Sequence, residues 1–110
     1  MNKKEQKLLN TFPKFEEHLE SSLQDSEFAK TWLDEALAEY STNQDINELI
    51  ISLKPLIEAN YTICDFAQKI GLHRITLYKI FSRKMVPSIE VLNKIFNGLG
   101  FELLLNVKKA

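Results

Sequence analysis

The sequence predicts an all-α fold that ends in one short β-strand. Apolar residues make up 45% of the 110 residues and recur at helical intervals along most of the chain, which indicates amphipathic helices around a core. The chain contains only three glycines and three prolines, which argues against a disordered or fibrous protein. Two short helical patterns meet at Gly71 in the layout of a helix-turn-helix. We expect one small domain with an N-terminal helical extension.

The first part of the chain predicts a helical lead-in followed by an amphipathic helix. Residues 3–23 indicate a short helix, a break at Pro13 and another helix. Asp25 or Ser26 can cap the helix that follows. Its apolar face is formed by Phe28, Trp32, Leu33, Ala36, Leu37 and Tyr40. We expect residues 41–45 to be a linker and cap.

The next helix carries a proline within its pattern. Its apolar stripe consists of Ile46, Leu49, Ile50, Leu53, Leu56 and Ile57. Pro55 lies inside this stripe, so we expect a kink or a restart after Lys54.

Residues 62–81 predict the helix-turn-helix itself. Thr62 and Asp65 have the spacing of a capping box, and Gly71 can take the left-handed conformation that ends the first helix. The buried positions of the two helices are Phe66, Ala67, Ile70, Leu77, Ile80 and Phe81, with Leu72 packed under the turn.

The outer face of the second helix indicates contact with double-stranded DNA. It presents His73, Arg74, Ile75, Thr76, Tyr78 and Lys79. In a helix-turn-helix, the first turn of the second helix meets base edges in the major groove. Arg83 and Lys84, just past this helix, are expected to touch phosphate. The alternative is an ordinary helical hairpin with a solvated basic face.

The C-terminal region predicts a last helix and a strand. Pro87 and Ser88 open the helix, whose core face is formed by Ile89, Leu92, Ile95, Phe96 and Leu99. The tail FELLLNV, residues 101–107, is too short for a stable helix and indicates a strand. A lone strand leaves its backbone groups unpaired, so it needs a mate elsewhere in this chain or in a second copy. No other segment is a convincing strand, which favours a second copy, and the alternative dimer contact is the last helix packed on its mate. The expected dimer contacts are Phe101, Leu103, Leu105 and Val107.

Charge is divided unequally along the chain. Residues 1–60 carry 6 lysines and 12 acidic residues, a net of −6, whereas residues 61–110 carry 8 basic and 3 acidic residues, a net of +5. This asymmetry suggests two partners of opposite charge, with phosphate backbone suited to the basic half. The alternative is a dipole without a function.

Other functional classes find little support in the sequence. No metal-ligand spacing, phosphate loop or nucleophile with a nearby base is present, so we expect no enzyme, no cofactor and no metal. No signal peptide and no apolar run of membrane-spanning length is apparent. Cys64, the single cysteine, is expected to be a reduced, part-buried thiol of a cytoplasmic protein.

Three blocks carry a family resemblance. They are LQDSEFAKTWLDEAL (23–37), FAQKIGLHRITLYKIFS (66–82) and, after Pro87, VLNKIFNGLGFELLL (91–105). In this order and spacing, the chain from Leu23 to Val107 resembles the HigA-type antitoxins of bacterial toxin–antitoxin operons, also called addiction module antidote proteins. The resemblance implies a Cro/C1-type, lambda-repressor-like helix-turn-helix at 42–110.

The resemblance also implies two activities. Such a protein neutralises a ribonuclease-type, RelE/HigB-like toxin by binding it, and it represses its own operon as a homodimer on a palindromic operator in a bacterial or phage-derived system. The acidic region 1–41 is the expected toxin-binding part, because toxins that hold RNA tend to be basic. The candidate contacts there are Glu27, Phe28, Trp32, Asp34, Glu35 and Glu39, with Glu16, Glu17 and Glu20 before them. The alternative for this helix is a plain core role with solvated acids.

The sequence departs from the family pattern at a few positions. Asp65 replaces a phosphate-binding glutamine, His73 replaces the usual serine at the turn, and Ile75 replaces a polar residue of the recognition helix. These changes suggest a different operator or a weakened DNA function. Two alternatives therefore stand beside the antitoxin: a free-standing Cro/C1-type repressor without a toxin, and an interaction module that no longer binds DNA.

Overall fold

The computed structural model describes residues 21–109, and from Ser26 onward these form five helices. They are α3 (Ser26–Asn43), α4 (Ile46–Asn60), α5 (Ile63–Ile70), α6 (Arg74–Phe81) and α7 (Ile89–Gly98). No strand occurs within 21–109, so the helical class is confirmed. The lead-in predicted over 3–23 falls almost entirely outside the described residues.

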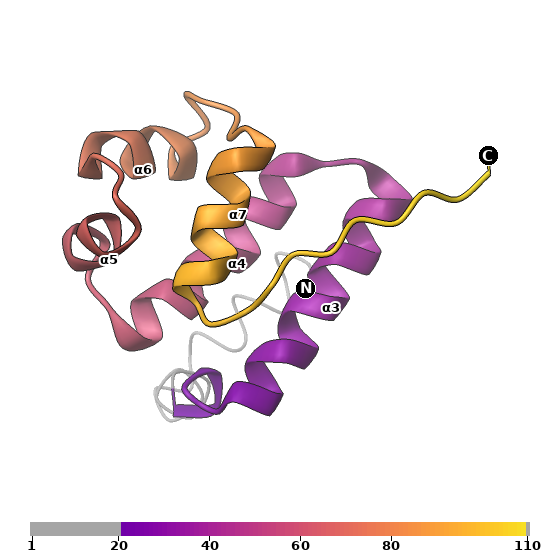
Figure 1. Ribbon diagram of the computed structural model, residues 1–110, viewed down its shortest axis with the longest axis horizontal. Coiled ribbons are helices and arrows are strands. Elements are labelled where there is room, and N and C mark those ends of the chain that lie inside the picture. The colour runs from indigo at the N-terminus through magenta and orange to yellow at the C-terminus, as the bar shows by residue number, and fades with distance from the viewer. Residues whose placement is uncertain (1–20, 110) are drawn as a thin grey trace, which may run out of the picture.

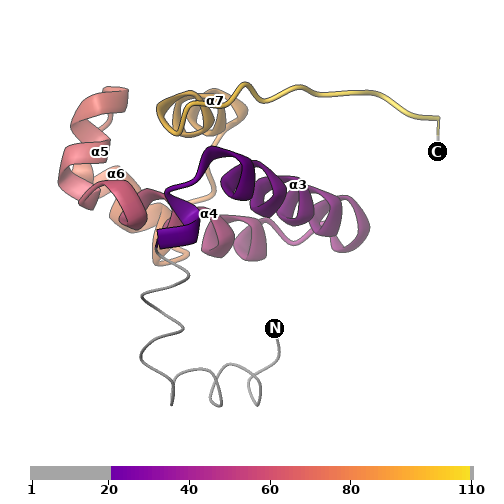
Figure 2. The same ribbon diagram turned by 90° about the horizontal axis from the view of Figure 1, so that it is seen from below.

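The helices form two groups that meet at α4. Helices α3 and α4 lie side by side, while α5 and α6 sit at one end of α4 (Figure 1). Helix α7 packs against α5 and returns the chain across the body (Figure 2). Among the described residues, this arrangement holds the basic pair α5–α6 at one end and leaves one side of α3 uncovered.

Polar side chains cap four of the helices in the manner that the sequence predicts. The hydroxyl of Thr62 accepts from the backbone N–H of Asp65 at 3.1 Å, and the hydroxyl of Ser88 accepts from that of Val91 at 3.2 Å. Asp25, rather than Ser26, caps α3. Because each cap satisfies a backbone donor that the helix leaves free, the caps fix where the helices begin.

Helix α3 is longer than predicted. Residues 41–43, expected in a linker, continue the helix, which ends at Gln44 in the left-handed conformation with φ 59°. The hydroxyls of Ser41 and Thr42 donate to the carbonyls of Leu37 and Ala38 four residues earlier. These bonds direct the polar side chains back onto the helix instead of into a turn.

Helix α4 continues through Pro55 as one helix, so of the predicted kink or restart after Lys54 the restart is wrong. Proline removes the hydrogen bond to the carbonyl four residues earlier, which belongs to Ile51. Ile51 is about half exposed, and water can therefore satisfy that carbonyl.

One hydrophobic core joins α3 to the other helices. Its buried members include Leu23, Ala29, Leu33, Ile50, Leu53, Leu56, Ile57, Phe66, Ala67, Leu77, Ile80, Ile95 and Phe96. No polar or charged residue is buried within 21–109. The division at 41/42 is therefore a proposal about function, because α3 contributes to the same core as the helices that follow.

Two predicted core positions lie on the surface instead. Phe28 is 40% exposed and Ile89 is 61% exposed. In α3 the buried stripe runs through Ala29, Leu33 and Ala36, so Phe28 lies at the edge of this stripe and is partly exposed to solvent. Ile89 is the first residue of α7 and borders a groove that the described chain only partly fills.

The tail after α7 is extended, and it forms no strand pair with residues 21–109. Its first residues, Phe101 and Leu103, still pack against the core, and the chain then runs beyond the helices (Figures 1 and 2). A strand needs a partner strand, and a single chain offers none among residues 21–109, so the predicted strand stays a prediction. No helix of the described chain is long and apolar enough to cross a membrane.

Candidate nucleic-acid interface

The turn between α5 and α6 is built on Gly71. Its φ is +75°, a conformation that glycine takes without a steric penalty. The N–H of Leu72 donates to the carbonyl of Ala67 at 2.9 Å, which closes the end of α5. His73 then opens α6 without a capping bond from its side chain, and its side chain is exposed.

Helix α6 is anchored on one side and open on the other. Leu77 and Ile80 are buried, and α6 packs against α4 and α5. On the outer side, Ile75 is 55% exposed and Tyr78 is 53% exposed. A helix held in this way presents its first turns as a rigid, accessible surface.

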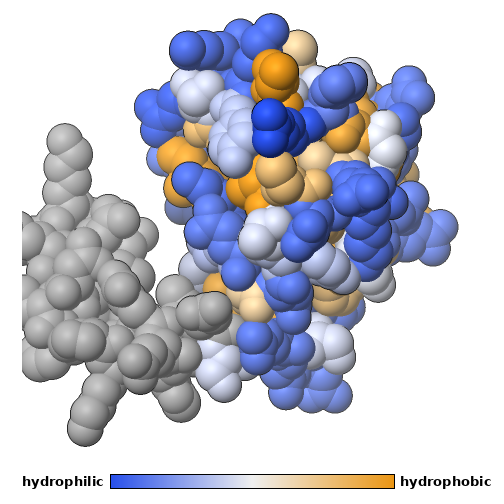
Figure 3. Space-filling model, turned by 90° about the vertical axis from the view of Figure 1, so that its left-hand side faces the viewer, coloured by the Kyte–Doolittle hydropathy of each residue, from blue (hydrophilic) through white to orange (hydrophobic). Residues whose placement is uncertain are grey.

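The predicted contact residues on this surface are mostly accessible. The exposed residues are His73, Arg74, Ile75, Tyr78 and Lys79, while Thr76 is half-buried. Figure 3 views the side of the molecule where α5 and α6 lie and shows hydrophilic residues with apolar ones set among them. The structure thus brings the predicted set together, with Thr76 the least available.

Arg74 reaches back to α5. Its Nη1 lies 3.8 Å from the Sγ of Cys64. Cys64 is exposed, so the prediction of a part-buried thiol is wrong. It follows Ile63 at the outer side of the first turn of α5, whereas Phe66 and Ala67 take the inner side. The thiol therefore lies beside the guanidinium at the edge of the candidate interface.

Arg83 and Lys84 lie in the turn that ends α6. Arg83 has φ +66°, and the N–H of Lys84 donates to the carbonyl of Lys79 at 2.8 Å. Both side chains are exposed, and neither takes part in the two ion pairs formed within residues 21–109. Their charges are available to an anionic partner.

Sequence reasoning missed the residues that follow this basic pair. Met85 is 41% exposed and Val86 is 70% exposed. The only signal was that two apolar residues follow Lys84 outside any helical pattern. They place apolar surface next to the cations of the α6–α7 loop.

One cation of the basic half serves the fold instead. The Nζ of Lys69 donates to the hydroxyl of Tyr61 at 2.6 Å and to the carbonyl of Gly98 at 2.9 Å, and it lies 4.7 Å from the centre of the Tyr61 ring. It therefore neutralises the end of α7 rather than adding to the interface. Asp65 is exposed on α5, and residues 21–109 contain no cluster of three potential metal ligands.

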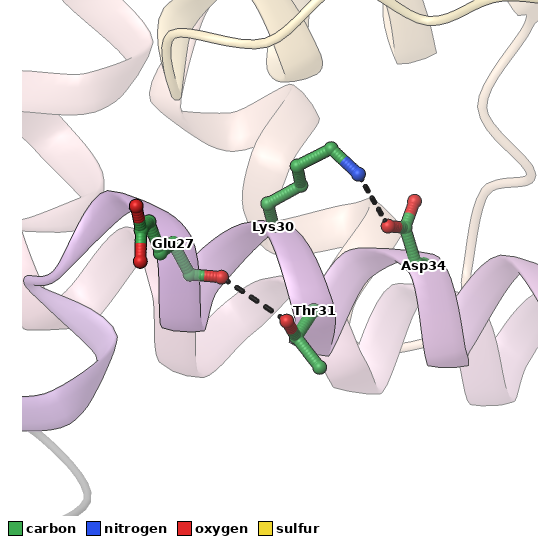
Figure 4. Close-up of polar contacts among 4 residues, drawn as sticks. All are labelled: Glu27, Lys30, Thr31 and Asp34. Atoms are coloured by element: carbon green, nitrogen blue, oxygen red, sulfur yellow. Dashed lines mark hydrogen bonds and ion pairs between the residues drawn. The ribbon is translucent and has the colours of Figure 1, made fainter.

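The second predicted site lies on α3. Some of its side chains already bond to other residues of the chain, and others are exposed to solvent. Lys30 pairs with Asp34 at 2.7 Å, and the hydroxyl of Thr31 donates to the carbonyl of Glu27 at 3.2 Å (Figure 4). The Nε1–H of Trp32 donates to the carbonyl of Ser52 at 2.7 Å, which ties the indole to α4.

The remaining candidate side chains of α3 are open. Glu27, Phe28, Glu35 and Glu39 are exposed, and none of them takes part in an ion pair within the described chain. Trp32 is half-buried and Asp34 already has a cationic partner, so these two are the least available for a second protein.

A comparison with protein families gives one result. The model of a family described as probable addiction module antidote protein matches residues 14–107, most of the chain. No curated protein and no solved structure matches the chain significantly. The matched range covers both the α3 surface and the α5–α6 surface.

Proposed function

The chain belongs to the probable addiction module antidote protein family, and we propose that it neutralises a toxin by binding it and represses its own operon by binding DNA. The DNA-binding part of this proposal rests on the outer face of α6. Arg74, Ile75 and Lys79 are exposed on that face. Leu77 and Ile80 are buried and anchor the helix. In this proposal, α5 and α6 are a helix-turn-helix of the Cro/C1 type that acts in the cytoplasm.

Direct readout belongs to the first turns of α6. Arg74 can donate two hydrogen bonds to guanine in the major groove. Ile75 is exposed and can contact a thymine methyl group, although it cannot hydrogen-bond a base. The exposed cations of Arg83 and Lys84 contribute affinity through phosphate, without sequence preference.

A two-fold dimer would place two such helices on one palindrome. Half-sites one turn of duplex apart require recognition helices separated by about 34 Å. The proposed dimer contact is the apolar tail Phe101–Val107, which ends the domain away from α6 (Figure 1). Self-pairing of two tails gives the two-fold symmetry that a palindrome demands.

The toxin would bind the outer side of α3. Residues 21–60 contain eight acidic residues and two lysines, and both lysines are paired to carboxylates of their own helix. The exposed Glu27, Glu35 and Glu39 therefore give this side an unbalanced negative charge. A basic, RelE/HigB-like ribonuclease toxin fits that charge, and Phe28 at the rim supplies an apolar contact.

The proposal is tested by the neighbouring gene product and the upstream DNA. The chain co-expressed with the protein of the adjacent reading frame should purify as a complex and should restore growth. The complex or the free chain should also retard the upstream region in a gel shift. If the chain retards the upstream DNA but forms no complex with the neighbouring protein, it is a free-standing repressor. If it forms the complex but does not retard the DNA, it is an interaction module.

A further inference from the structure

The C-terminal tail divides into an anchored and an overhanging part. Phe101 and Leu103 pack against the core of their own chain. Leu105 is 69% exposed and Val107 is fully exposed. Side chains two residues apart in an extended segment share a face, so these four residues form one apolar face that begins on the core and becomes exposed toward the end of the tail. Figure 2 shows the backbone of this segment extending past the helices.

The backbone of the overhanging part forms no hydrogen bond with the described residues. Phe101 donates its N–H to the carbonyl of Phe96 at 2.9 Å, and beyond it no backbone group of residues 102–109 is bonded to another residue of the range 21–109. An extended apolar segment with free donors and acceptors is a template for a second strand.

The charges of the tail select one register of self-pairing. When two tails lie antiparallel with Leu105 opposite Leu105, Leu103 faces Val107 and Glu102 faces Lys108. A centre at Leu104 leaves Lys108 opposite Gly100, and a centre at Asn106 puts Leu104 opposite Lys108. Opposite charges placed directly across a strand pair are favourable, so the Leu105 register is preferred.

From these observations we propose that two copies of this chain pair their tails antiparallel about Leu105, with Glu102 of each facing Lys108 of the other. In each copy Leu105 borders a groove that Leu37, Ile46 and Ile89 also line. In the pair, Val107 of one copy faces Leu103 of the other and extends over that groove. This inference rests on the proposed dimer and specifies its geometry.

Cysteine cross-linking tests the register. In a Cys64→Ser background, Leu105→Cys should form a disulfide-linked dimer on mild oxidation, because residues opposite each other across the two-fold axis have close Cβ atoms. Leu104→Cys and Leu103→Cys should each stay monomeric on a non-reducing gel, whereas mixing Leu103→Cys with Val107→Cys should give the linked species. Linkage of Leu104→Cys instead of Leu105→Cys overturns the register.

A charge swap tests the same contact without cysteines. Glu102→Lys should lower the dimer fraction measured by sedimentation, because a lysine at residue 102 then faces Lys108 at both ends of the strand pair. The double variant with Glu102→Lys and Lys108→Glu should restore the dimer fraction. A double variant that remains as weak as the single variant also overturns the inference. Toxin binding and operator retardation by the wild-type chain, measured in parallel, report on the proposed function independently of the register.

Discussion

The backbone of α7 at Gly98 lies directly against the side chain of Ile70 at the end of α5. A Cβ at residue 98 would collide with the Cγ2 of Ile70 and lie 3.0 Å from the Cζ of Phe66. The close approach lets α7 pack on α5, and the carbonyl of Gly98 is also held by Lys69. The pair α5–α6 is thus packed firmly against α7, the helix that leads into the tail.

Gly98→Ala should destabilise the protein. Alanine favours a helix over glycine by about 1 kcal/mol, so without a collision the change would stabilise. Overpacking costs about 1–3 kcal/mol, and we expect that term to dominate because Phe66 is fully buried and has little room to move. Urea unfolding measures the difference, and a smaller cost in an Ile70→Ala background would attribute it to this contact. A higher midpoint for Gly98→Ala alone would show that the helices can separate.

Thr62→Ala should cost about 1 kcal/mol of stability, because the variant loses the N-cap of α5. Thr62→Ser, which keeps the hydroxyl, is the matched control and should lose much less. Thermal unfolding of the three proteins checks this, and equal losses for both substitutions would point to packing of the methyl group instead.

Arg74→Ala and Lys84→Ala should weaken DNA binding in different ways. Loss of a bidentate base contact costs about 1–3 kcal/mol of discrimination at one base pair of each half-site. Loss of a phosphate contact should weaken operator and random DNA alike and reduce the salt dependence of binding. Fluorescence anisotropy with both DNAs at several salt concentrations separates the two, and equal losses for Arg74→Ala on both DNAs would remove it from base readout.

Trp32→Phe should destabilise the fold rather than act on the toxin surface. It removes the indole hydrogen bond to the carbonyl of Ser52, at a cost of about 0.5–1.5 kcal/mol. Glu35→Lys with Glu39→Lys should leave stability nearly unchanged, since both carboxylates are exposed, and should weaken toxin binding. Calorimetry of unfolding and of toxin binding distinguishes the outcomes. Full toxin affinity in the double variant would place the toxin elsewhere.

The sequence predicts the helices well because their signals are local. Thr62, Gly71 and Ser88 mark helix ends by their own hydrogen bonds or backbone freedom, and the structure has these ends where expected. The sequence pattern places Phe28 and Ile89 in the core, whereas both are exposed, because a broad apolar stripe does not indicate which of its edges meets the next helix. That choice depends on long-range packing.

The sequence predicts some parts of the candidate sites and not others for the same reason. The outer face of α6 follows from helical spacing, since Leu77 and Ile80 must point inward. That Trp32 is tied to Ser52, that Cys64 is exposed beside Arg74, and that Met85 and Val86 are exposed depends on contacts between elements or on their absence. No local pattern encodes these relationships.

Separation of the two proposed activities tests the account most directly. Cells that carry the neighbouring toxin gene and an operon reporter would receive the wild-type chain, Arg74→Ala or the Glu35→Lys, Glu39→Lys double variant. Arg74→Ala should rescue growth but derepress the reporter, while the double variant should repress the reporter but fail to rescue growth. Loss of both activities in stable, folded forms of both variants, or no rescue by the wild-type chain, would contradict it.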